Sequence, residues 1–278
     1  MKNKITSCIW FNGNAGEAAD FYIDVFKHGE KTNQDLPIVS LNVFSTDLLF
    51  LNGGPSYAPT PAFSFFLYCG SHEEAERIFN LLAIGGNIMI PMGSYEWAEK
   101  YGWVTDKYGI SWQIDGDDIR VEEKICPALL FVNEKSNRVK EAREFYLSVF
   151  GTSQMLMEMP ADVHHGLEPG SLLFTQIKLM QSVVNLMAGP GNHDFDFTSG
   201  NSFVVSCDTQ EEIDYYWNQL GYDGRYDMCG WLTDKFGVSW QIVPRELSVW
   251  LSDSVHGKSA TERMLKMKKL IISDLINN

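Results

Sequence analysis

The strongest constraint on the fold is that the sequence contains the same unit twice. Residues 102–114 read GWVTDKYGISWQI, and residues 230–242 read GWLTDKFGVSWQI. Two further pairs match in the same order in both halves, EAADFYIDVF with EAREFYLSVF and SFFLYCGSHEE with SFVVSCDTQEE. Three matches in one order identify an internal repeat. We therefore expect a first domain over residues 1–118 and a second over residues 123–250.

Each half alternates between strand-like and helix-like segments. Short β-like runs at 5–11 and 127–132 precede helices whose apolar residues, such as Tyr22 and Tyr146, recur at three- and four-residue spacing. A meander, another strand and a second helix with a capping-box start come next. The half then closes on the GW…WQI hairpin. This order predicts an α+β fold, in which each domain is built from two βαβββ units that form a cupped, half-open barrel.

The paired hairpins also predict which side chains face the cup. Gly109 and Gly237 follow the sequence Asp-Lys-aromatic, which suits a type I turn, and are expected to adopt positive φ. Side chains alternate between the two faces of a strand. If Trp112 and Trp240 face the helices, the glutamine that follows each tryptophan faces the cup.

Residues 258–276 form a separate segment with an apolar stripe at Met264, Met267, Ile271 and Leu275. Helical spacing of the stripe predicts a C-terminal helix that docks on the body of the protein. A helix that binds a partner or a membrane surface is the alternative.

Composition narrows the class of protein. Of the 278 residues, 45% are hydrophobic and 21% are charged, which is typical of soluble globular proteins. There is no apolar run of about 18 residues that would span a membrane. The net charge of −14 disfavours nucleic acid as a partner and attracts cationic ligands if acidic groups converge on a cleft. The N-terminal residues do not resemble a targeting segment, so we expect a cytoplasmic protein.

Three stretches carry a resemblance to a known family: WFNGNAGEAADFY (10–22), LNGGP (51–55) and GWLTDKFGVSWQIVP (230–244). They are similar to the PhnB-like, or 3-demethylubiquinone-9 3-methyltransferase-type, branch of the vicinal-oxygen-chelate (glyoxalase/bleomycin resistance/dioxygenase) superfamily. The resemblance covers nearly the whole chain in two tandem copies. Single-copy relatives typically form homodimers, so it implies that the two halves pair within the chain, as a monomer or a homodimer with two clefts.

Enzymes of this superfamily usually hold a divalent metal on one face of the sheet. The resemblance places Ser7, Ser64 and Gln113 at the ligand positions of the first half, and Ala128, Ser202 and Gln241 at those of the second. None of these is a histidine, cysteine or carboxylate, and two serines with a glutamine cannot offset the dehydration of a metal ion. We therefore expect no metal and no cofactor.

Other groups offer weak alternatives. His164 and His165 beside Glu168 could gather a metal, but they lie in a proline-containing loop without a counterpart in the first half. Cys229 would need a nearby cation to act as a nucleophile. The five cysteines are scattered without a CxxC pair, which excludes a zinc ribbon. No catalytic residue can be named.

The sequence feature that indicates a binding site is its aromatic residues. Strand alternation places Ser64, Phe66 and Tyr68 on one face, and an apolar cup with few polar groups suits a planar organic molecule. The predicted binding residues are Ser7, Ser64, Phe66, Tyr68, Gln113, Ser202 and Gln241. The first hypothesis is a metal-free protein that binds a small hydrophobic or aromatic molecule, as in resistance-type sequestration. The alternative is an enzyme of the superfamily, a lyase, an isomerase or, by family label only, a methyltransferase.

Overall fold

A computed structural model describes residues 4–34, 37–117 and 123–276. The chain divides into two compact units, a large unit of Ser7–Asn201 and a small unit that combines Met1–Thr6 with Ser202–Asn278. The compact units do not coincide with the two sequence repeats, and the domains expected over 1–118 and 123–250 stay a prediction. The large unit contains all but the start of the first repeat and continues through the first βαβββ module of the second repeat.

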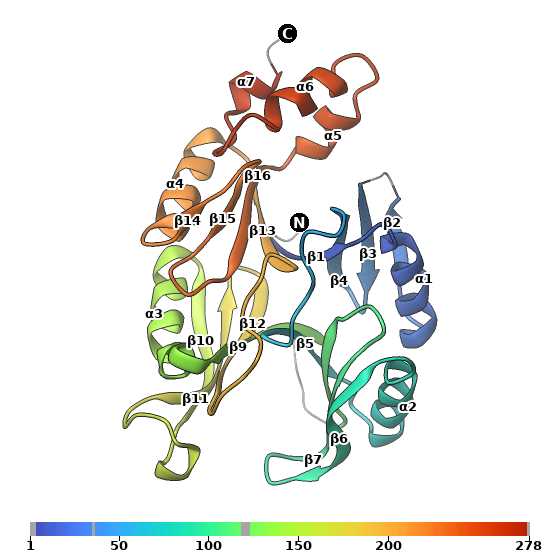
Figure 1. Ribbon diagram of the computed structural model, residues 1–278, viewed down its shortest axis with the longest axis vertical. Helices are drawn as coiled ribbons and strands as arrows, with labels where there is room; N and C mark the ends of the chain where they lie inside the picture. The colour runs from blue at the N-terminus through green and yellow to red at the C-terminus, as the bar shows by residue number, and fades with distance from the viewer. Residues whose placement is uncertain (1–3, 35–36, 118–122, 277–278) are drawn as a thin grey trace. The chain divides into compact units, whose positions relative to one another are not determined.

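The βαβββ module occurs four times, as the sequence predicted (Figure 1). In chain order the first repeat contains β1 (Ile5–Phe11), α1 (Ala15–Phe26), β2 (Glu30–Asn33), β3 (Ile38–Val43) and β4 (Thr46–Asn52), then β5 (Phe63–Tyr68), α2 (His72–Leu82), β6 (Asn87–Tyr95), β7 (Ala98–Thr105) and β8 (Ser111–Asp115). The second repeat contains β9 (Ile125–Val132), α3 (Val139–Val149), β10 (Ser153–Pro160), β11 (Leu172–Leu179) and β12 (Ser182–Gly189), then β13 (Asn201–Cys207), α4 (Gln210–Gly221), β14 (Arg225–Tyr226), β15 (Trp231–Thr233) and β16 (Ser239–Pro244).

The large unit contains an eight-stranded sheet with the order β10-β11-β12-β9-β5-β8-β7-β6. Its centre is the antiparallel pair of β5 and β9, in which Ser64 lies opposite Ala128 and Phe66 opposite Cys126. Because β5 belongs to the first repeat and β9 to the second, the two halves of the sequence pair within this sheet. Strands β1, β4, β3 and β2 lie side by side in the same unit, and β14, β15, β16 and β13 do so in the small unit.

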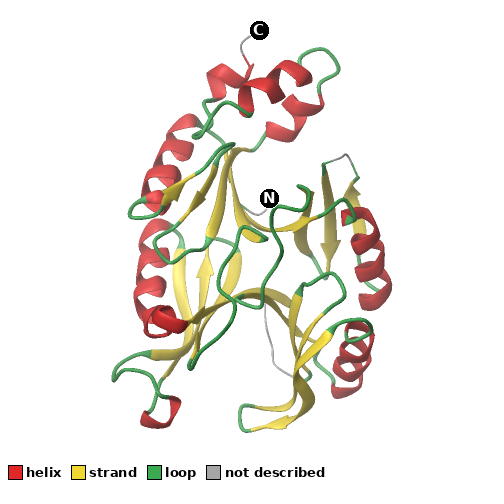
Figure 2. Cartoon of the chain, viewed as in Figure 1, coloured by secondary structure: helices red, strands yellow, loops and turns green. Residues whose placement is uncertain are grey.

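Helices α2 and α3 lie on the outer face of the eight-stranded sheet, and the inner face is concave (Figure 2). Trp112 of β8 lies on the helix side, where its ring packs 5.4 Å from Tyr22 and 5.1 Å from Phe26 of α1. Gln113 lies on the concave side. The strand register expected from the hairpin sequence is therefore observed.

A buried aspartate explains why the hairpin sequence is repeated. Asp106 accepts hydrogen bonds from the backbone N–H groups of Tyr108 (2.8 Å) and Ile110 (3.1 Å), and from the Trp112 indole Nε1 (2.9 Å). Asp234 makes the same three types of contact, with Phe236, Val238 and Trp240. The carboxylate thus ties the turn to the core tryptophan. Gly109 and Gly237 have φ of 82° and 94°, the left-handed conformation that glycine adopts without strain.

The C-terminal segment docks, but not as one helix. Helix α5 (Leu247–Ser252) precedes the segment, and α6 (Gly257–Met264) and α7 (Ile272–Ile276) replace the single helix expected over 258–276. Between α6 and α7 the chain pairs with the segment before β15, since Cys229 N–H donates to the Met267 carbonyl and Gly230 N–H to the Lys268 carbonyl, each at 2.7 Å. This backbone pairing with residues 229 and 230 therefore interrupts the helix. None of the helices in the described part of the chain is long and apolar enough to cross a bilayer.

Candidate functional site

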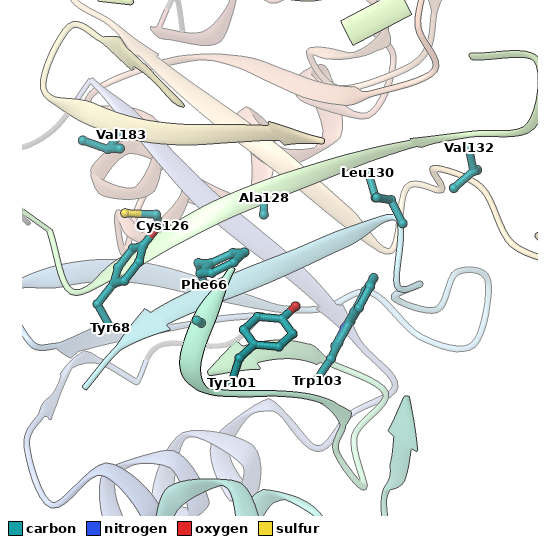
Figure 3. Close-up of a cluster of buried hydrophobic side chains, with 10 residues drawn as sticks. Phe66, Tyr68, Tyr101, Trp103, Cys126, Ala128, Leu130, Val132 and Val183 are labelled. Atoms are coloured by element: carbon teal, nitrogen blue, oxygen red, sulfur yellow. The ribbon is translucent and has the colours of Figure 1, made fainter. Parts of the chain in front are cut away.

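The concave face of the eight-stranded sheet gathers most of the predicted binding residues of the first repeat. Phe66 and Tyr68 of β5 and Tyr101 and Trp103 of β7 turn toward the small side chains of β9, including Ala128 (Figure 3). These side chains form one continuous cluster. Five partly buried side chains pack against it: Met89, Ile90, Tyr95, Met187 and Phe195. The face is aromatic on the β5–β7 side and aliphatic on the β9–β12 side.

Gln113 lies at the centre of this face and is fully buried. Its Oε1 accepts a hydrogen bond from the Tyr101 hydroxyl at 2.6 Å, and its Nε2 donates to Ser64 Oγ at 2.8 Å. The Nε2 group also lies 3.5 Å from the Met187 sulfur. The amide is therefore engaged within the protein, and its direct role in the structure is to link β8 to both neighbouring strands.

We expect the Gln113→Ala variant to lower the free energy of unfolding by about 1–3 kcal/mol, because Tyr101 and Ser64 would lose their buried partners. This differs from what a glutamine free to meet a ligand would show, namely little change in stability. Urea denaturation followed by tryptophan fluorescence measures the difference. A Gln113→Glu variant is a stricter comparison. A loss of less than about 0.5 kcal/mol in the free energy of unfolding for Gln113→Ala would contradict a stabilising role of these hydrogen bonds.

The remaining predicted residues separate into two groups. Ser7 lies in β1, which pairs with β4, and so belongs to a different sheet from Ser64 and Gln113. In the small unit, Gln241 Nε2 donates to Ser202 Oγ at 2.9 Å, which repeats the bond between Gln113 and Ser64. The sequence therefore located matching pairs in both repeats, but it grouped Ser7 with the wrong partners.

The side chains at the ligand positions in the large unit do not suit a metal. Ala128 has no donor atom, and the amide of Gln113 and the hydroxyl of Ser64 are bonded to each other. Within the described residues, no group of three or more histidine, cysteine, aspartate or glutamate side chains could hold a metal ion. The divalent metal that the superfamily implies therefore finds no suitable ligand set on this face.

The two alternative groups have structural explanations. His165 belongs to a single capped turn, in which its Nδ1 accepts the Asp162 N–H at 3.0 Å and Asp162 Oδ1 accepts the His164 N–H at 2.8 Å. Cys229 adopts φ of 59° where its backbone meets the C-terminal segment. Burial raises the pKa of its thiol, which is the opposite of what an activated nucleophile needs.

The β10–β12 side of the concave face is open to solvent and rich in methionine, which sequence reasoning missed. Strand pairing puts Met159 beside Phe174 and Phe174 beside Met187, in line with Leu130 of the cluster. Met157 lies beside Gln176, whose Nε2 donates to Asn185 Oδ1 at 2.9 Å. Met157 and Met159 are 47% and 40% exposed, so the apolar face continues from the buried cluster out to solvent. Alternation in SQMLMEMP was the available signal, but a β-bulge after Met155 changes its phase.

A second residue missed by sequence reasoning is Asp115, the last residue of β8. It lies two positions after Gln113 and therefore on the same face, beside Tyr68 of β5 and Tyr101 of β7. Burial raises the pKa of its carboxyl from an ordinary value of 3.8 to about 6. The alternation that placed Gln113 in the cup would have placed Asp115 there too.

Known proteins match this chain at the level of family and fold. The profile described as 3-demethylubiquinone-9 3-methyltransferase matches residues 3–115 and again 123–243. Protein YjdN of Escherichia coli is 31% identical over 77 residues, which are 27% of this chain and 52% of YjdN, so the chain spans about half the length of the curated relative it matches.

Two solved structures illustrate the range of likeness. A PhnB protein of Bacillus cereus, titled a putative 3-demethylubiquinone-9 3-methyltransferase, is 30% identical over 41% of this chain and 98% of its own, with a TM-score of 0.37. Glyoxalase I of Zea mays is 13% identical, covers 87% of this chain and 93% of its own, and has a TM-score of 0.57, which shows a shared fold alone. With the profile matching both repeats, the chain belongs to the 3-demethylubiquinone-9 3-methyltransferase (PhnB-like) family and carries two copies of its domain in tandem.

Proposed function

We propose that the protein binds a small hydrophobic or aromatic molecule on the concave face of the eight-stranded sheet, without a metal. The ligand is held and released unchanged, as in a resistance-type sequestering role. The observation that carries the proposal is the continuous apolar face, which runs from the buried aromatic cluster to exposed methionines at β10.

Methionine suits such a surface. Its unbranched, polarizable side chain adapts to ligands of different shape, and exposed apolar patches often mark binding sites. Phe174 and Met187 are half-buried beside Met159 and form the floor on which a planar ligand would lie. The polar groups near this floor, Gln176 and Asn185, are few, as expected of a site that selects mainly by shape and apolar contact.

Access to the aromatic side lies at the β6–β7 hairpin. Pairing of β6 with β7 is interrupted by three register shifts, between Ile88 and Ile90, Ile90 and Gly93, and Gly93 and Tyr95. At the tip, Trp97 is 60% exposed and stacks on Tyr95 at 5.0 Å. An irregular edge strand has fewer ladder hydrogen bonds to break, so it is the element that can move to admit a ligand.

Two methionines of β10 provide a matched test. Met157 and Met155 are 47% and 46% exposed, but Met157 pairs with Gln176 on the concave face and Met155 with Ile177 on the opposite face. We expect the neutral fluorescent probe N-phenyl-1-naphthylamine to bind the full chain saturably. Met157→Gln should weaken binding about fivefold, equivalent to about 1 kcal/mol of lost apolar contact. Met155→Gln should leave the affinity within about twofold.

Fluorescence titration of the three proteins gives the dissociation constants directly. Equal losses for the two variants, or absence of saturable binding, would contradict the proposal. Recovery of the ligand in chemically altered form would favour an enzyme instead.

A further inference from the structure

Asp115 is a buried carboxylate to which no lysine or arginine of the described residues is paired. Its residue is 6% exposed, and the hydrogen bond that its Oδ1 accepts is from the backbone N–H of Asp117 at 2.9 Å. Among the described residues no lysine or arginine forms an ion pair with it; His72, the nearest basic group on α2, is paired with Asp117 at 3.4 Å. A carboxylate held in this way carries a desolvation cost that a bound cation would offset.

Aromatic rings connect this carboxylate to solvent. The centroid of exposed Trp97 lies 5.8 Å from that of Tyr101, Tyr101 lies 6.0 Å from Phe66, and Phe66 lies 5.4 Å from Tyr68. Tyr101 and Tyr68 are the strand neighbours of Asp115 on either side. Aromatic faces attract organic cations through their quadrupoles, most strongly where water is excluded.

The fold does not require this arrangement, because the second repeat lacks it. In the matched segments, Val243 stands where the first repeat has Asp115, Cys229 where it has Tyr101, and Ser206 where it has Tyr68. Both repeats keep the structural parts of the motif, which are the aspartate of the turn, the core tryptophan and the glutamine bonded to serine. The acid and its rings are therefore specific to the concave face of the large unit.

We propose that this face binds a protonated aromatic amine, with its ammonium group at Asp115 and its ring among Tyr68, Tyr101 and Phe66. This inference rests on the proposed function and names the chemical class of its ligand. The net charge of −14 acts in the same direction, because it raises the local concentration of cations at the protein surface.

Three compounds with one ring system and different charge test the inference: 1-naphthylmethylamine, 1-naphthalenemethanol and 1-naphthaleneacetate. Calorimetric titration of the full chain at pH 7.5 should give at least tenfold tighter binding of the amine than of the alcohol, and weakest binding of the acetate. Asp115→Asn should remove the preference for the amine and leave the affinity for the alcohol within twofold.

Glu99→Gln is the matched control. Glu99 lies on β7, the strand that pairs with the strand of Asp115, and its side chain is 85% exposed. Its replacement changes the net charge by the same amount. This variant should keep at least half of the preference for the amine. Equal losses in the two variants would mean that general surface charge attracts the amine, which would overturn the inference.

The pH dependence gives a second readout. Amine affinity of the natural sequence should fall as the pH drops below about 6, where the Asp115 carboxyl takes up a proton. Among the described residues, the other groups that act electrostatically on Asp115 are Asp117, Tyr68, Tyr101, Cys69 and His72. Burial raises the pKa values of the two tyrosines and of the thiol, so these groups stay neutral, and the profile should persist in a His72→Gln variant.

The outcomes separate the two proposals. If the alcohol binds in the cup and the amine binds no better, the amine inference fails and the proposed function stands. If none of the three compounds binds, both fail.

Discussion

Replacing Trp112 by alanine is expected to lower the free energy of unfolding by about 3–5 kcal/mol, the range for loss of a large buried aromatic side chain. Trp112 is 1% exposed and contacts the rings of Tyr22, Phe26 and Phe65. Its indole also donates to Asp106, so truncation leaves a buried carboxylate with one donor fewer. Chemical denaturation followed by circular dichroism gives the loss.

Two variants make this result specific. Trp97→Ala removes an exposed tryptophan of the same unit and should change the stability by less than about 0.5 kcal/mol. Trp112→Phe keeps one aromatic ring but loses the N–H and the second ring of the indole, so it should cost less than Trp112→Ala. A cost below 1 kcal/mol for Trp112→Ala would show that the tryptophan is not a core residue and that the register of β8 is wrong.

The Asp115→Asn variant is expected to be more stable than the natural sequence at pH 8, by about 1–3 kcal/mol. The carboxyl has a pKa of about 6 in the folded chain against an ordinary value of 3.8, and each pH unit between them is worth about 1.4 kcal/mol. Solvent at the end of β8 screens part of this cost, which sets the lower bound. The asparagine Oδ1 can still accept the Asp117 N–H.

The direction of the pH dependence follows from the proton that Asp115 binds. Because the folded chain holds this proton more tightly than the unfolded chain, the stabilisation by protonation is complete below pH 3.8 and is lost as the pH rises through about 6. The advantage of Asp115→Asn should therefore vanish near pH 3.5. Glu99→Gln should show no such dependence, and a destabilised Asp115→Asn chain at pH 8 would refute the buried-carboxylate account. If the Asp115 carboxylate is retained for binding, its removal is expected to increase the stability of the folded chain.

Local patterns predicted the faces of the strands well. The alternation in GISWQI places Trp112 among helix side chains and Gln113 in the cup, and both positions are observed. Glycine at the fourth position of the turn predicted the positive φ of Gly109. These features depend on neighbours along the chain, which is why sequence spacing is sufficient for them.

Pairing of the two halves was expected from the family resemblance, but the partner of each individual strand could not be predicted. The sequence grouped Ser7 with Ser64, but β5 pairs with β9 of the second repeat, so that Ala128 lies opposite Ser64. Two copies of one module can pair within or between repeats with similar local sequences. The contact between Gln113 and Met187 of β12 depends on that choice, whereas Ser64 and Tyr101 belong to the same module as Gln113.

The C-terminal segment shows the same limit. Its apolar stripe has helical spacing, yet Leu270 is fully buried next to Gly230 in an extended stretch. The hydrogen bonds from Cys229 and Gly230 to this stretch are long-range contacts, which helical propensity cannot predict.

Binding of a ligand on the concave face of the large unit can be observed directly through the methyl resonances of its methionines. The chain has 11 methionines, and Met157, Met159 and Met187 lie on this face. Carbon-13 methyl spectra of the full chain should be recorded with increasing N-phenyl-1-naphthylamine, whose rings shift nearby methyl signals. We expect saturable shifts at Met187, Met157 and Met159, with Met155, Met264 and Met267 unchanged. Shifts confined to the latter three, or to none of the methionines, would contradict binding on this face.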